Sequence, residues 1–365
     1  MGIAIWLKGM RPQTLPASVA PVVIGAAAAW TSIRQLGVCA LTYPAPESCA
    51  INRATQTTLE SRFWPLAILC TLVALFLQIA VNFANDYSDG VRGVDEGRAA
   101  SPALPASPAS SSSAVPTGTP PVAVVLSGRR DGIAATSIHA PARLVASGVP
   151  PKRVLTSAGT AAALACLCGL AIVVITGHWW LLAVGVCCLL AGWCYTGGRH
   201  PYGYTGLGEL FVFVFFGLVA VLGTQFVLCG TVTATGVLGA VQAGLLSCVL
   251  LMVNNLRDVD SDRVHGKRTL AVRLGEQRAR ILTVASYAIA FVPVAVMALV
   301  LLVLSVVGSA GSQYRWAIAA YGVICLAIAA LTIRAMLRRD HAHALPLVGL
   351  SLLVCAVGYV GLAAI

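Results

Sequence analysis

Charged side chains are scarce in this sequence. Of its 365 residues, only 10% are Asp, Glu, Lys or Arg, and 58% are hydrophobic, whereas an ordinary soluble domain has about 25% charged residues. This number of charged residues is too small to cover the surface of a water-soluble fold. The surroundings of this chain must therefore be lipid. Aromatic residues are also few, at 7%, while 35 glycines suit closely packed membrane helices. The composition excludes a disordered chain, a disulfide-rich secreted module and a coiled coil.

The sequence contains several long apolar stretches. A membrane-spanning helix needs about 20 mostly apolar residues, and the stretches lack the two-residue alternation of an outer-membrane strand. The sequence therefore predicts an all-α polytopic membrane protein with about nine transmembrane helices. The expected spans are residues 14–32, 64–85, 154–176, 178–196, 208–228, 235–256, 281–306, 315–336 and 344–363.

Lys and Arg are distributed unevenly between the two sides of these spans. With nine spans, 20 of the 24 basic residues fall on the side of the N-terminus, and cytoplasmic loops accumulate Lys and Arg. This predicts a multi-pass protein of the cell (inner or plasma) membrane with a cytoplasmic N-terminus and an external C-terminus. The net charge of +11 then reflects topology and anionic lipid headgroups. We expect no nucleic-acid partner and see no sign of an obligate protein partner.

One stretch, about residues 99–139, departs from the apolar pattern. It contains six prolines between Pro102 and Pro121 and a run of four serines at 110–113. Such a composition cannot bury a core. We therefore predict one membrane domain over residues 1–365, with a disordered Pro/Ser-rich cytoplasmic insert in it.

Ten of the 12 cysteines fall in or beside apolar spans, where they are expected to pack as small apolar residues. Cys39 and Cys49 share an expected outer loop, where the compartment permits a disulfide. The sequence leaves that pairing open.

The few acidic residues gather in two places. Seven of the 13 lie in two short windows, each beginning with asparagines at the cytoplasmic end of an expected span. The windows contain Asn82, Asn85, Asp86, Asp89, Asp95 and Glu96 in the first, and Asn254, Asn255, Asp258, Asp260 and Asp262 in the second. Helical spacing places Asn82, Asn85, Asp86 and Asp89 on one stripe and Asn254, Asp258 and Asp262 on another, while Asp260 points elsewhere.

Like charges at this spacing repel one another, so a cation is expected between them. Carboxylate and amide oxygens suit Mg²⁺, which commonly takes one or two carboxylates together with substrate phosphates. Basic residues follow both windows. The interleaved acids and bases therefore indicate a site for a magnesium diphosphate, although ion pairs that only cap helix ends are the plainer alternative.

Several motifs extend this pattern over most of the chain. They are RPQTLP at 11–16, NFANDYSDG at 82–90, PARLVASG at 141–148, GLGE at 206–209 and NNLRDVDSDRVHGKRTLAVRLG at 254–275. With these motifs the sequence resembles the UbiA superfamily of intramembrane prenyltransferases, and within it the menaquinone branch, the 1,4-dihydroxy-2-naphthoate polyprenyltransferases. The first motif departs from the superfamily pattern because Gly93 stands where a third acid is often found and Asp95 comes two residues later.

The resemblance implies a UbiA-type bundle with a cytoplasm-facing cavity and Mg²⁺ as cofactor. The implied reaction transfers a polyprenyl group from a polyprenyl diphosphate to 1,4-dihydroxy-2-naphthoate, with loss of CO₂ and diphosphate, and gives demethylmenaquinone. Asp89, Asp258 and Lys267 would be catalytic. The magnesium ligands would be Asn85, Asp86, Asp89, Asp258 and Asp262, with Asp95 as an additional candidate. The diphosphate would bind to Arg92, Arg143, Lys267 and Arg268, and the aromatic acceptor to Arg11, Asn82 and Asn254.

Three alternatives stay open at this point. Another aromatic acid such as 4-hydroxybenzoate could be the acceptor, and a membrane transporter is a rival of a different class. Arg11 and Arg143 could also bind the acceptor's carboxylate or serve only as positive anchors. Glu209 is expected to begin a helix or to support the site by hydrogen bonding.

Overall fold

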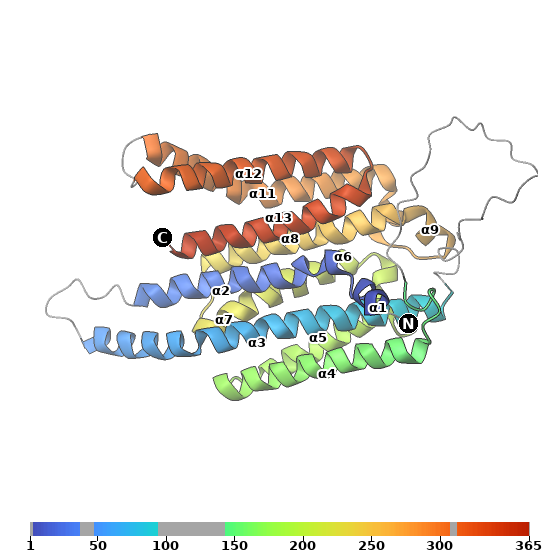
Figure 1. Cartoon of the computed structure of the whole chain (residues 1–365), viewed down its shortest axis with the longest axis horizontal. Helices are drawn as coiled ribbons and strands as arrows, with labels where there is room; N and C mark the ends of the chain where they lie inside the picture. Colours follow the sequence, from blue (N-terminus) through green and yellow to red (C-terminus); the bar gives the residue numbers. More distant parts are fainter. Residues whose placement is uncertain (1–2, 37–46, 94–142, 307–311, 365) are drawn as a thin grey trace, which may run out of the picture.

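The computed structural model describes residues 3–36, 47–93, 143–306 and 312–364, and every regular element within these ranges is helical (Figure 1). Each of the nine expected spans corresponds to a helical segment. These segments are α2 (Pro16–Leu36), α3 (Glu47–Val91), α4 (Pro151–Thr176), α5 (Leu181–Thr196), the continuous run α6 (Gly208–Val212), η5 (Phe213–Leu222) and α7 (Gly223–Cys229), then α8 (Ala234–Arg257), α11 (Glu276–Val306), α12 (Ser312–Leu337) and α13 (His341–Ala364).

Seven of these segments are long and apolar enough to cross a membrane, which confirms the all-α membrane fold. The other two are α5, which has 16 residues, and α11, which has 31 residues but whose C-terminal side chains lie outside the described part of the chain. The predicted insert, Asp95 and Cys39 lie outside the described residues, so the insert and the Cys39–Cys49 disulfide stay predictions. The ten cysteines in or beside the apolar spans are free thiols, as their apolar surroundings predict.

Short helices gather at the end of the bundle that holds the N-terminus, and the C-terminus lies at the opposite end (Figure 1). They are α1 (Ile3–Gly9), η1 (Pro12–Thr14), η4 (Tyr202–Thr205), α9 (Val259–Val264) and α10 (Leu270–Leu274). Helix α1 ends at Gly9 and α2 begins at Pro16. The linking residues between α1 and α2 thereby reach the polar end of the bundle.

Helix α2 lies between two groups of helices. It packs with α8, α11 and α13 in one apolar cluster and with α3, α4 and α7 in another. The first cluster contains many small residues, including Ala240 and Ala243, both fully buried. A Cβ atom at Gly217 of η5 would lie 2.7 Å from both the carbonyl oxygen of Ala240 and the Cα of Gly244. Glycine therefore permits η5 and α8 to approach backbone to backbone.

Candidate active site at the polar end of a membrane cavity

A single cavity of about 770 Å³ joins the polar end of the bundle to an apolar interior. Along α3 it extends from Asp89 to Cys70, which is about 28 Å at the rise of an α-helix. Its deep walls come from apolar residues of α2, α4, α5, η5 and α7, including Val22, Ile172 and Val227. The cavity can therefore take a molecule with a charged head and a long apolar tail.

The two acidic windows converge on this cavity. Asp89 from the first window lines it together with Asp258 and Asp262 from the second. Lys267 joins the windows, because its Nζ lies 3.0 Å from Oδ1 of Asp89. The two windows, which are distant in the sequence, therefore meet at one cavity in the fold.

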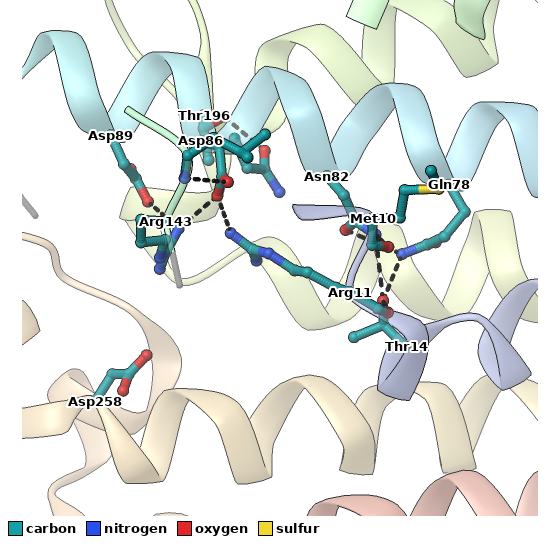
Figure 2. A network of polar contacts seen from close by, with 12 residues as sticks. Met10, Arg11, Thr14, Gln78, Asn82, Asp86, Asp89, Arg143, Thr196 and Asp258 are labelled. Atoms are coloured by element: carbon teal, nitrogen blue, oxygen red, sulfur yellow. Dashed lines mark hydrogen bonds and ion pairs between the residues drawn. The ribbon is translucent and has the colours of Figure 1, made fainter. Parts of the chain in front are cut away.

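The polar face of α3 carries two neighbouring rows of side chains (Figure 2). In one row, Asn82 donates to the carbonyl oxygen of Met10 at 2.8 Å and Gln78 contacts the hydroxyl of Thr14 at 3.3 Å. Asp86 continues this row toward Arg11. This first row fastens the segment between α1 and α2 to α3.

The second row consists of Asn85 and Asp89. The amide oxygen of Asn85 accepts a hydrogen bond from the hydroxyl of Thr196 at 2.7 Å. Asp89 binds Lys267 and also Arg143, whose Nη1 lies 3.2 Å from its Oδ2. Both members of this row line the cavity.

Asp86 differs from the other acids in its surroundings. It is 1% exposed and does not line the cavity. Its Oδ1 lies 2.6 Å from Nη2 of Arg11 and 3.4 Å from Nη1 of Arg143, and its Oδ2 accepts from the backbone N–H of Leu144 at 3.2 Å. Asp86 thus connects three segments of the chain beneath the cavity wall.

The second window follows its expected stripe. Asn254, Asp258 and Asp262 all line the cavity, and Asp258 lies across from α3 in Figure 2. Asp260 points away, as predicted, with a side chain 92% exposed and 3.7 Å from Arg263. Arg257 binds both oxygens of Asp258, at 3.0 and 3.1 Å.

Glu209 has the supporting role expected of it. It lies in the first turn of α6, and its Oε1 accepts a hydrogen bond from Asn255 at 2.9 Å. Asn255 itself follows Asn254 in the second window and lines the cavity. Glu209 therefore supports the site through Asn255.

Two of the predicted diphosphate-binding residues do not line the cavity. Arg92 donates hydrogen bonds to the carbonyl oxygens of Thr196 and Gly198 at 2.7 and 2.6 Å, so its side chain caps the C-terminal end of α5. The side chain of Arg268 is exposed, while its backbone N–H binds the carbonyl oxygen of Tyr204 at 3.0 Å. Lys267 and Arg143, in contrast, both face the interior.

Tyr204 of η4 was not identified from the sequence. Its hydroxyl donates a hydrogen bond to Asp89, and Lys267 lies over its ring at 4.6 Å from the centroid. Burial, followed by the nearby Asp89 charge, raises the pKa of Tyr204, so its hydroxyl remains a neutral donor. Its signal in the sequence is only a tyrosine in a Gly-rich loop, which is common at membrane interfaces.

The oxygen ligands at the polar end of the cavity suit a Mg²⁺ ion that binds together with the diphosphate. Among the described residues, no group of three or more His, Cys, Asp and Glu could hold a metal ion by itself. Asn85, Asp89, Asp258 and Asp262 nevertheless offer oxygen ligands to one cavity. Mg²⁺ usually needs only one or two carboxylates when phosphates complete its coordination, so these residues fit the ion together with a diphosphate.

Comparison with known proteins finds similar sequences in one family. The model of the UbiA prenyltransferase family matches residues 134–355. The 1,4-dihydroxy-2-naphthoate octaprenyltransferase of Mycobacterium tuberculosis is 40% identical over 76% of this chain and 73% of its own length, and that of Escherichia coli is 32% identical over 75% and 70%. A UbiA homolog from Archaeoglobus fulgidus, bound to DMAPP and Mg²⁺, has a TM-score of 0.47 at 13% identity, with 95% of this chain and 98% of that chain covered.

The family match covers more than half of the chain and includes the complete second acidic window. The alignment with the mycobacterial relative covers more than two thirds of each of the two sequences. The resemblance inferred from the motifs is thereby confirmed, and this chain belongs to the UbiA prenyltransferase family.

Proposed function

We propose that this protein transfers a polyprenyl group from a polyprenyl diphosphate to 1,4-dihydroxy-2-naphthoate in menaquinone biosynthesis. One observation carries the proposal: a single cavity places Asp89, Asp258 and Lys267 at one end and a long apolar chamber behind them. The names of the bacterial relatives, 1,4-dihydroxy-2-naphthoate octaprenyltransferases, support this choice of acceptor.

The polar end binds the diphosphate and the apolar chamber binds the tail. Lys267 and Arg143 present positive charge to the cavity, where the ester oxygen of the diphosphate gains negative charge as the allylic C–O bond breaks. When bound to Asn85, Asp89, Asp258 and Asp262, Mg²⁺ would neutralise further charge on the leaving group. The apolar walls exclude the water that would otherwise capture the allylic cation.

The proposed reaction balances without an added oxidant or base. The C–O bond of the diphosphate breaks and its electron pair leaves with the diphosphate. The ring carbon that carries the carboxylate forms the new C–C bond, and CO₂ then leaves while its bonding pair restores the aromatic ring. The product is demethylmenaquinone in its reduced, quinol form, so the transfer itself involves no net redox change.

The polar end of the cavity is proposed to face the cytoplasm, where the soluble naphthoate is available. The bias of Lys and Arg toward the N-terminal side supports this orientation. The lipid bilayer then supplies the polyprenyl diphosphate, whose tail is insoluble in water. This arrangement differs from that of a transporter, in which isolated acids near the middle of spans would be expected, because Asp89, Asp258 and Asp262 lie together at one end.

The test is to incubate the purified protein in lipid nanodiscs with a polyprenyl diphosphate, Mg²⁺ and one aromatic acid. We expect a prenylated naphthoquinol, identified by mass, and release of CO₂ from carboxyl-labelled 1,4-dihydroxy-2-naphthoate. Product from 4-hydroxybenzoate alone would move the assignment to another acceptor within the family. Absence of any prenylated product would contradict the proposed activity.

A further inference from the structure

We infer that Asp86 is a positioning residue for the acceptor and not a magnesium ligand. In this role it holds the guanidinium of Arg11 at the cavity wall, where Arg11 binds the carboxylate of the aromatic acid. The inference rests on the proposed function and assigns part of its acceptor site. It also separates Asp86 from Asp89, which the sequence motif places together.

The surroundings of Asp86 leave it poorly placed to coordinate a metal. Its side chain is 1% exposed and does not line the cavity, whereas Asp89, whose oxygens are also bonded, does line it. The Oδ1 of Asp86 binds the guanidinium of Arg11, and its Oδ2 accepts from the N–H of Leu144, which is fully buried. A metal that reached Asp86 would have to displace Arg11 at Oδ1 or a buried backbone donor at Oδ2, and an unsatisfied buried N–H is costly.

The position of Asp86 on α3 agrees with this role. It follows Gln78 and Asn82 at intervals of four residues, and those two side chains bind Thr14 and the carbonyl of Met10. All three members of the row therefore hold the segment around Arg11. Asp89 belongs to the other row, with Asn85, and lines the cavity.

Arg11 is held in an unusual backbone conformation. Its φ is 53°, in the left-handed region that non-glycine residues rarely adopt. Such a conformation persists only where the surroundings impose it, and it is frequent at functional sites. Here Thr14 binds the Arg11 carbonyl through both its backbone N–H and its hydroxyl, each at 2.9 Å, while Asp86 fixes the side chain.

Arg11 is also suited to bind an anion. Its side chain is 20% exposed and lines the cavity. A guanidinium has five N–H donors in a planar fork that matches a carboxylate, and the short bond to Asp86 engages Nη2 alone. Burial, followed by the neighbouring Arg143, lowers the pKa of Arg11, yet an arginine remains charged at neutral pH.

Asp86 and Asp89 are paired with different cations. Asp86 binds Arg11 and Asp89 binds Lys267, while Nη1 of Arg143 lies within 3.4 Å of both carboxylates. If Asp86 became neutral, Arg11 would lose the partner that fixes its orientation. If Asp89 became neutral, Arg11 would keep that partner.

The test compares Asp86→Asn, Asp89→Asn and the exposed control Asp260→Asn in nanodiscs. The probes are 1-hydroxy-2-naphthoate, a stable analogue of the acceptor, 1-naphthol, which lacks the carboxylate, and geranyl diphosphate with Mg²⁺. For Asp86→Asn we expect a loss of about tenfold in affinity for the naphthoate. Binding of 1-naphthol and the Mg²⁺ dependence of diphosphate binding should not change.

Asp89→Asn should give the reverse pattern, with impaired Mg²⁺-dependent diphosphate binding and retained naphthoate binding. The inference is overturned if Asp86→Asn impairs Mg²⁺-dependent diphosphate binding as Asp89→Asn does, or if Asp86→Asn leaves the affinity for the naphthoate unchanged. It is also overturned if the wild type does not bind the naphthoate, either with or without magnesium diphosphate. Should Asp86→Asn fail to fold, Arg11→Gln, which leaves Asp86 bonded to Leu144, must weaken naphthoate binding selectively, and unchanged binding contradicts the inference.

Failure of the proposed function gives a different result. In that case the wild type forms no product from 1,4-dihydroxy-2-naphthoate under any condition. Failure of the inference alone leaves a wild type that prenylates the naphthoate and an Asp86→Asn variant with unaltered acid binding.

Discussion

The Nζ of Lys267 lies 3.0 Å from Oδ1 of Asp89, although 178 residues separate them in the chain. Both side chains are buried, at 9% and 5% exposed, and the Tyr204 ring lies against the Lys267 ammonium. The pair joins the end of α3 to the loop after α9 and so brings the two acidic windows to one cavity.

Replacement of Lys267 by Met should remove most of the activity. Met retains the length of the side chain but supplies no charge to the departing diphosphate, so we expect kcat to fall about 10²–10³-fold. Steady-state turnover with geranyl diphosphate measures the effect. Arg268→Met is the matched control, because that side chain is exposed and does not line the cavity. Equal losses in the two variants would argue against a specific role for Lys267.

Asp89→Ala and Asp258→Ala should each abolish turnover without loss of expression. Both carboxylates line the cavity from opposite sides, and each is proposed to hold magnesium with the diphosphate. The measurement is turnover as a function of Mg²⁺ concentration, with Asp260→Ala as the exposed control. Near-normal activity of both variants at high Mg²⁺ is incompatible with the proposed metal site.

Cys70→Trp should shift the preference of the protein toward shorter prenyl tails. Cys70 lines the deep end of the cavity, and behind it Phe63 and Leu66 pack in a buried apolar cluster. The larger side chain removes space from the chamber, so kcat/KM for a long-chain diphosphate should fall about tenfold or more relative to geranyl diphosphate. Cys187→Trp, at an exposed cysteine, should leave the ratio unchanged. A uniform loss for both tails would mean that the tail does not reach Cys70.

Gly217→Ala should destabilise the bundle. The added Cβ would meet the backbone of α8 at 2.7 Å, and overpacking of this kind costs about 1–3 kcal/mol. Unfolding in mixed detergent measures the change. Gly159→Ala in α4 is the control, because nothing lies within 4 Å of its added Cβ, and it should be neutral or slightly stabilising. Equal stabilities would show that η5 and α8 can separate at little cost.

Much of the fold and part of the site follow from the sequence alone. Apolar length determines the helical segments, and helical spacing groups Asn254, Asp258 and Asp262, which line one cavity, apart from Asp260, which is exposed. These properties depend on local periodicity, which a single sequence contains.

Contacts between distant segments could not be predicted in the same way. The stripe of acids and amides on α3 divides into two rows only because the Met10–Thr14 segment packs against one of them. Arg92 follows Asp89 closely in the sequence, yet its guanidinium caps the C-terminal end of α5. Tyr204 becomes part of the site through the approach of η4 to Asp89.

The contacts among Asp86, Asp89 and Arg143 also determine how this end of the bundle can move. Two ranges of the described chain, 47–93 and 143–306, meet here, because the Arg143 side chain and the Leu144 N–H are both bonded to the end of α3. A displacement of this end of α3 would therefore carry Asp89 and Arg143 together, so the carboxylate and the cation would keep their spacing at the cavity.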